Sequence, residues 1–294
     1  MDVLIYLTTD LLTTSIIAGM FGLVVGSFLN VVIYRLPLMM ERQARAECAE
    51  WLGQLPPDHD QSSPFDLVHP RSHCPQCKHQ LTVLENIPLL SYLWQRGRCT
   101  ACHQPISIRY PLTEVLSAIF AILTAWHFGF GWPLLGALLL TWALLAASII
   151  DIDHQLLPDS ITLQFLWVGI FCNLFHFYTD LPSSVIGAIA GYLSLWTIYW
   201  LFKLLTGKEG MGYGDFKLLA LLGAWMGWQY LLTTVLLSSL VGAVVGIGLI
   251  LVHGYDKNHP LPFGPYLAAA GWLNFLWGPS ITQTLTTWNI YLLH

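Results

Sequence analysis

Eight long runs of apolar residues, separated by charges, prolines and short polar stretches, decide what this chain can fold into. Most of them approach the ~20 residues that an α-helix needs to cross the hydrocarbon core of a bilayer. Only 10% of the 294 residues are Asp, Glu, Lys or Arg, whereas an ordinary soluble domain carries about 25%. We therefore predict an all-α polytopic membrane protein with about eight transmembrane helices. The runs cover residues 11–34, 112–128, 132–150, 161–177, 185–205, 216–228, 231–252 and 261–277.

The run at 216–228 is shorter than the others, so we expect a tilted or partly submerged helix there. The first run has no basic segment before it and no small-residue cleavage site after it, so it is interpreted as a retained helix.

The basic residues predict the orientation of these helices, because Lys and Arg near helix ends stay on the cytoplasmic side. If the N-terminus lies outside, the inside segments are 35–111, 151–160, 206–215 and 253–260. All twelve Lys and Arg residues then lie in or beside inside segments, eight of them from Arg35 to Arg109. This distribution supports both the number of helices and their direction.

The long polar segment after the first run contains "CPQC" at residues 74–77 and "CTAC" at 99–102. Two Cys-x-x-Cys pairs about twenty residues apart are typical of a zinc ribbon, in which four thiolates surround one structural ion. The alternative is two disulfides or free thiols, which a reducing cytoplasm makes less favourable. His79 and His103 are potential substitute ligands. The predicted ligands are Cys74, Cys77, Cys99 and Cys102.

These features divide the chain into three predicted parts. Residues 1–35 form the first transmembrane helix, 36–111 a small cytoplasmic zinc-binding domain, and 112–294 a seven-helix membrane domain.

Two groups of carboxylates lie at the predicted cytoplasmic ends of apolar runs. "IIDIDHQLLPD" holds Asp151, Asp153 and Asp159, and "GYGD" ends in Asp215. Ionisable side chains at such places are costly and often functional. Two carboxylates that meet can share a proton, so that one activates water while the other protonates a peptide carbonyl. This pattern favours aspartic protease chemistry.

The residues alone leave open which acid pairs with Asp215. Asp151 lies closest to the apolar helix, and Asp153 follows two residues later. Asp159, between Pro158 and Ser160, is typical of a turn or a helix cap. Asp215 itself could simply favour the first turn of a helix, although the two glycines before it favour close backbone approach to a substrate.

Together, "GMGYGDFKL" (210–218), "DIDHQLLPD" (151–159), the paired Cys-x-x-Cys and "GSFLNVVIYRLP" (26–37) resemble the type IV prepilin peptidase family. The resemblance covers nearly the whole chain. It implies a bacterial inner-membrane enzyme with eight spans and a cytoplasmic zinc-binding insertion. By position, it assigns the catalytic roles to Asp151 and Asp215 and the zinc thiolates to the four cysteines above.

The resemblance also implies the reaction. Substrates would be type IV prepilins and type II secretion pseudopilins, cut after a Gly at the end of a short basic leader on the cytoplasmic side. It further implies methylation of the new N-terminus by S-adenosylmethionine. Polar side chains that could line a pocket for this donor are Ser27, Asn30, Arg35, Glu85, Asn86, Ser91 and Tyr92. Alternatively, Ser27 and Asn30 hold helices together and the Arg35 side chain extends to the lipid headgroups.

The main alternative is an ion- or proton-coupled transporter in which the two acids relay cations and the zinc domain is regulatory. Such a protein would be expected to carry acids near mid-span and internal repeats, whereas both acids here are predicted at the cytoplasmic mouth.

Overall fold

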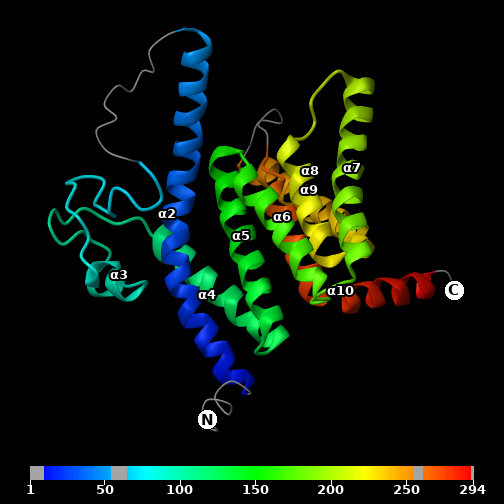
Figure 1. Ribbon diagram of the computed structural model, residues 1–294, viewed down its shortest axis with the longest axis horizontal. Coiled ribbons are helices and arrows are strands. Elements are labelled where there is room, and N and C mark those ends of the chain that lie inside the picture. The colour runs from blue at the N-terminus through cyan, green and yellow to red at the C-terminus, as the bar shows by residue number, and fades with distance from the viewer. Residues whose placement is uncertain (1–9, 54–64, 254–260, 293–294) are drawn as a thin grey trace. The chain divides into compact units, whose positions relative to one another are not determined.

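The computed structural model describes residues 10–53, 65–253 and 261–292, and these form helices joined by loops, without strands (Figure 1). Two isolated β-bridges, His73 with Gln80 and Arg98 with Pro105, interrupt the polar insertion. The chain divides into two compact units, Met1–Phe130 and Gly131–His294. The all-α fold predicted from the sequence is confirmed.

The first unit is built on two helices that pack along each other, α2 (Leu11–Trp51) and α4 (Arg109–Phe128). Their backbones come close because α2 presents glycines to α4. A Cβ added to Gly26 would lie 2.7 Å from the Cα of Glu114. The Ser117 hydroxyl also donates to the carbonyl of Gly22 at 2.6 Å. Small residues and a buried hydroxyl are common at helix contacts in membranes.

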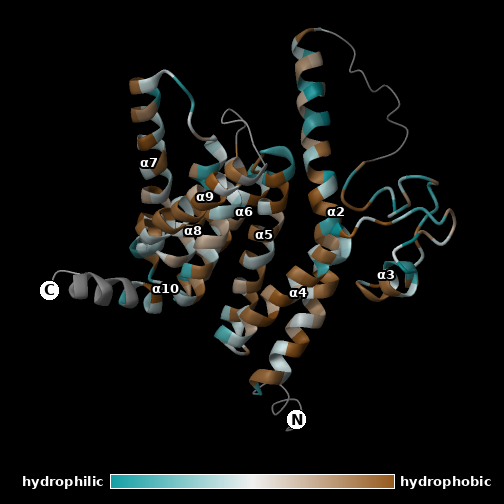
Figure 2. Cartoon of the chain, turned by 180° about the vertical axis from the view of Figure 1, so that it is seen from behind, coloured by the Kyte–Doolittle hydropathy of each residue, from teal (hydrophilic) through white to brown (hydrophobic). Residues whose placement is uncertain are grey.

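The helix α2 does not end near residue 35, where the first predicted segment stops. It continues through Pro37 to Trp51, and its surface turns from hydrophobic to hydrophilic past the start of α4 (Figure 2). The polar extension carries pairs four residues apart, Arg45 with Glu41 and Gln43 with Glu47, which stabilise a solvated helix. Pro37 therefore marks the change of surface and not the end of the helix.

The insertion is attached to α2 through Arg35. Its guanidinium group is buried and donates to the carbonyls of Asp66 at 2.8 Å and Pro70 at 2.5 Å. The Arg35 side chain is thus not free to reach lipid headgroups, which was one of the two readings left open by the sequence. The short helix α3 (Leu90–Trp94) and the 3₁₀ turn Leu84–Asn86 complete this unit.

The second unit packs α5 (Trp132–His154), α6 (Asp159–Leu174), α7 (Leu181–Thr206), α8 (Tyr213–Met226), α9 (Leu231–His253) and α10 (Gly264–Leu292) together. The short helix α8 lies against α6, α7 and α10, and every residue from Asp215 to Met226 except Lys217 is buried. Each apolar run of the sequence lies largely within one helix.

Among the residues that the structure describes, five helices are long enough and apolar enough to cross a membrane. They are Leu11–Trp51, Arg109–Phe128, Trp132–His154, Leu181–Thr206 and Trp228–Leu249, and Asp159–Leu174 is a shorter apolar helix. The polytopic character is thereby supported, while eight crossings remain a prediction.

A close helix contact of the second unit yields a test of this packing. A Cβ on Gly223 would lie 2.2 Å from the carbonyl oxygen of Gly187. We expect Gly223→Ala to lower the free energy of unfolding by about 1–3 kcal/mol, because backbone atoms must move apart. In the matched control, Gly248→Ala, the new methyl group meets no described atom within 4 Å. Thermal unfolding in detergent should show a lower midpoint for Gly223→Ala only, and equal midpoints would contradict the described α7–α8 contact.

Candidate active site and metal centre

Asp151 lies in the last turn of α5 and is buried, with 6% of its surface exposed. Its Oδ2 atom accepts a hydrogen bond of 3.0 Å from the backbone N–H of Gly264, the first residue of α10. A Cβ on Gly264 would lie 2.6 Å from the same oxygen. The carboxylate thus rests against the N-terminus of a helix, which favours a negative charge, and only glycine fits there.

Asp215 lies in the first turn of α8 and is also buried, with 7% exposed. The backbone N–H of Gly212, the residue before this helix, donates toward its carboxylate. Asp151 is near enough to act electrostatically on Asp215. The structure therefore brings together the two acids to which the family resemblance assigns the catalytic roles.

Leu157 packs where three segments of the second unit meet. It is buried, and the ideal Cβ position of Gly214 lies 2.7 Å from its Cβ while that of Gly264 lies 3.3 Å from its Cδ1. Gly214 is therefore small because Leu157 needs the space.

The backbone of Gly212 is extended, at φ −78°, so this glycine adopts no conformation closed to other residues.

The four predicted metal ligands converge in the first unit. Their sulfur atoms all lie within 4.8 Å of one another, with 3.8 Å between Cys74 and Cys102 and 3.9 Å between Cys77 and Cys99. Four thiolates at ~2.3 Å from one tetrahedral ion lie ~3.8 Å apart, whereas disulfide sulfurs are ~2.05 Å apart. All four thiols are free, so the donor set fits a metal ion and not two disulfides.

The two Cys-x-x-Cys loops have the same local geometry. In each, the residue four positions after the first cysteine has a positive φ, 61° at Lys78 and 57° at His103, and donates its N–H to the carbonyl of that cysteine. Backbone N–H groups of Cys77 and Gln76 lower the pKa of the Cys74 thiol below its usual range. A thiolate stabilised in this way is ready to bind a cation.

Comparison with known proteins agrees with this geometry. Residues 20–128 match the model of the bacterial Peptidase A24 N-terminal domain, and residues 138–247 match that of the type IV leader peptidase family. A protein of Aeromonas hydrophila named prepilin leader peptidase/N-methyltransferase is 57% identical over 91% of this chain and 92% of its own length. A protein of the same name from Pseudomonas aeruginosa is 53% identical over 97% of both chains. No solved structure was found to match.

The chain belongs to the type IV leader peptidase family. The resemblance that the sequence motifs carried is thereby confirmed.

The remaining acids near the site of this family member lie in different surroundings. Asp153 lies two residues after Asp151 on the same helix and is exposed. The buried Asp151 is therefore the better partner for Asp215. The N-cap position of α6 belongs to Pro158, and Asp159 is the first residue of the helix. The Asp159 carboxylate binds the ammonium group of Lys217 through both oxygens, at 2.6 and 2.7 Å. This pair joins the start of α6 to the first turn of α8, two residues after Asp215.

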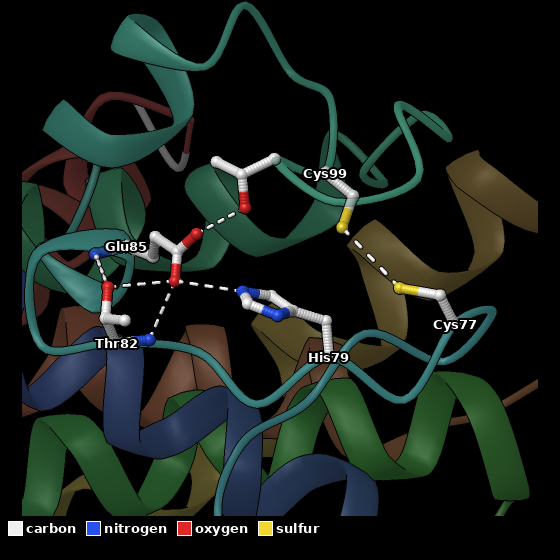
Figure 3. A network of polar contacts seen from close by, with 6 residues as sticks. Cys77, His79, Thr82, Glu85 and Cys99 are labelled. Carbon is white, nitrogen blue, oxygen red and sulfur yellow. Dashed lines mark hydrogen bonds and ion pairs between the residues drawn. The ribbon is translucent and has the colours of Figure 1, made fainter.

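Glu85 connects the two cysteine loops of the insertion (Figure 3). Its carboxylate accepts hydrogen bonds from the backbone N–H and the hydroxyl of Thr82, both at 2.8 Å, and from the hydroxyl of Thr100. His79 lies 3.4 Å away. These hydrogen bonds, of which the one from Thr100 has the largest effect, lower the pKa of Glu85 to about 2. Glu85 and His79 thus support the metal centre from outside the thiolate cluster.

Two of the polar side chains that could line a methyl-donor pocket are bound to other parts of the first unit. Asn30 donates to the carbonyl of Tyr110 at 3.1 Å, and Ser27 donates to the carboxylate of Glu114. Glu114 was missed in the sequence analysis. It is buried and also accepts the N–H of Leu89 at 2.8 Å. A single acid inside an apolar run was the sign that could have revealed it.

The ion pair beside Asp215 is expected to position α8 for cleavage. Because both side chains are partly exposed, it contributes no more than about 1 kcal/mol. Lys217→Asp should therefore lower the rate of leader removal a few-fold, and the exchanged pair Asp159→Lys with Lys217→Asp should recover most of it. Lys208→Asp, at another exposed lysine of the same region, should leave the rate unchanged. Failure of the exchange to restore the rate would contradict this positioning role.

Removal of one thiolate should abolish metal binding. We expect purified Cys74→Ser protein to contain little metal and to unfold at a lower temperature, because the insertion depends on the ion for its folding. Elemental analysis of the purified protein measures this directly. Cys48→Ser, at an exposed cysteine outside the cluster, should retain its metal. A Cys74→Ser protein with full metal content would contradict the four-thiolate site.

Proposed function

We propose that this chain is a membrane endopeptidase that removes the short basic leader of type IV prepilins and type II secretion pseudopilins. Cleavage would follow a Gly on the cytoplasmic side of the bacterial inner membrane, and the new N-terminus would then be methylated with S-adenosylmethionine. The observation that carries the proposal is the pair of buried carboxylates, Asp151 and Asp215, at the ends of two apolar helices. The names of its relatives support both activities.

The surroundings of the two acids support different roles for them. Asp151 accepts the N–H of Gly264 at the N-terminus of α10, so it is the group better able to hold a negative charge. Asp215 is buried to the same degree and lies in the field of Asp151. Two carboxyl groups so close share one proton, and we assign that proton to Asp215.

The hydrolysis then follows from these protonation states. Asp151 takes a proton from a water molecule, and the water oxygen attacks the carbonyl carbon of the scissile peptide bond. Asp215 gives its proton to the carbonyl oxygen, which yields a neutral tetrahedral diol. Asp151 next returns its proton to the leaving nitrogen, the carbon–nitrogen bond breaks, and Asp215 regains a proton from the diol. Both acids end in their starting states.

The metal centre has a structural role in this proposal, with zinc as the ion. The Zn²⁺ ion prefers four tetrahedral thiolates, and the cluster of Cys74, Cys77, Cys99 and Cys102 provides them. Four protein ligands leave no position for a reacting water. The ion would therefore hold a small insertion together and take no part in cleavage.

The methyl transfer is supported by the relatives' names and not by a described pocket. Bound S-adenosylmethionine would supply a methyl group to the N-terminal amine of the cleaved substrate. Four of the seven side chains that could line its pocket, Ser27, Asn30, Arg35 and Glu85, are held by protein groups of the first unit.

The decisive experiment uses the purified full chain in detergent and a synthetic prepilin with a basic leader ending in Gly. Asp151→Asn and Asp215→Asn should each lower the rate of leader removal by at least about 10²-fold, the usual contribution of a general acid or base. Asp153→Asn should cut at nearly the normal rate. Mass spectrometry identifies the cut, and a one-methyl increment that requires S-adenosylmethionine identifies the transferase.

An Asp215→Asn protein that cleaves at the normal rate would exclude the paired-acid mechanism. An intact substrate with folded, metal-loaded protein would contradict the proposed peptidase activity, and the alternative of a transporter receives no support from the relatives.

A further inference from the structure

A hydrogen bond inside the first unit fixes the level of α3 along α4. The N–H of Leu89, the residue before α3, donates to the buried carboxylate of Glu114 at 2.8 Å. Glu114 lies five residues after Arg109, the first residue of α4, which is about 7.5 Å along the helix. The start of α3 is therefore held beside the first turns of a helix that is apolar and long enough to cross a membrane (Figure 1).

The helix α3 exposes an apolar face at this level. Leu90, Leu93 and Trp94 lie three and four residues apart, so they share one side of the helix. All three are exposed, and 85% of the surface of Trp94 is accessible. Such an exposed cluster on a small domain marks an interaction site.

Basic side chains follow this face directly. Arg96 and Arg98 are exposed and line a surface hollow together with Thr100 and His103. Tryptophan is enriched at the membrane–water interface, and arginine binds phosphate with two parallel hydrogen bonds. A band of Leu and Trp followed by Arg is therefore suited to the border between acyl chains and headgroups.

The neighbouring surface of α4 continues this face. Tyr110 and Leu112, in the first turn of α4, are also exposed, and the Leu89–Glu114 bond keeps α3 next to them. Lipid that surrounds the entry of α4 into the membrane would reach α3 without interruption. This continuity favours lipid as the occupant over a separate protein.

We propose that residues 90–98 form a membrane-docking surface, defined by Leu90, Leu93, Trp94, Arg96 and Arg98, which lies in the bilayer interface where α4 enters. The three apolar side chains lie among the upper acyl chains, and the two arginines bind the phosphates of anionic phospholipids. The metal-binding insertion thus has a third attachment to the membrane besides α2 and α4. This surface is independent of the peptidase reaction.

The test is photo-crosslinking of the full chain, with its metal, reconstituted into vesicles of phosphatidylethanolamine and phosphatidylglycerol. A benzophenone amino acid replaces Trp94 in one variant and Trp51 in the control. Trp51 is 91% exposed but lies sixteen residues beyond Arg35 on α2, about 24 Å further along the helix. Mass spectrometry then identifies the molecules attached at each position.

We expect phospholipid adducts at position 94 and at least about tenfold fewer at position 51, since the headgroup region is only several ångströms thick compared with a 24 Å displacement. Adducts at position 94 that contain only protein, or equal lipid labelling at both positions, would overturn the proposal. The first of these results would assign the surface to contacts between chains or within the chain.

A second variant tests the arginines without touching the proposed catalytic acids. Arg96→Gln with Arg98→Gln should reduce lipid labelling at position 94, because each basic residue near an anionic surface shifts such an equilibrium about fivefold. In the protein that keeps both arginines, replacing phosphatidylglycerol by phosphatidylcholine should likewise reduce lipid labelling at position 94. Labelling that is insensitive to both changes would overturn the assignment of the arginines to lipid phosphates.

Discussion

The second unit of this protein depends on the burial of a carboxylate that needs a hydrogen-bond donor. A buried charge without a partner is too costly to keep, and the N–H that Asp151 uses comes from Gly264, more than a hundred residues later. The bond exists only if the end of α5 and the start of α10 meet. Leu157 packs beside Gly264 and also beside Gly214, the residue before Asp215. The placement of both acids is thus tied to one packing arrangement.

Close backbone contact makes this arrangement rigid. The short helix α8 is buried along almost its whole length, and Gly223 lets it approach Gly187 of α7 so closely that no side chain fits between them. Van der Waals packing of this kind is the main attraction between helices where lipid removes the hydrophobic driving force. A helix too short to cross the bilayer unaided can therefore hold Asp215 in place through its neighbours.

The sequence predicted the features that depend on a single short segment of the chain. Apolar runs predicted the helices because length and hydropathy are properties of each segment, and the spacing of the cysteines predicted their cluster. Positions at helix ends pointed to Asp215 and to the group that contains Asp151, and the family resemblance then selected Asp151 from that group. The sequence could not predict Gly264 or Lys217 as partners of acids, because those contacts join segments far apart in the chain. It also placed the end of the first helix at residue 35, whereas paired side chains on the polar surface stabilise this helix as far as Trp51.

The first unit contains a polar insertion that has too little apolar surface to form a core of its own. Its cohesion comes from the thiolate cluster, from Glu85 between the two cysteine loops, and from Arg35, which binds backbone carbonyls of the loop. Each of these ties is polar and directional, so together they set an orientation as well as a fold. Glu114 extends the same logic into α4: because its carboxylate pairs with the N–H of Leu89, the insertion is held at one level of the helix. Hydrogen bonds and the thiolate cluster thereby hold the insertion in place, although it has little apolar surface to bury.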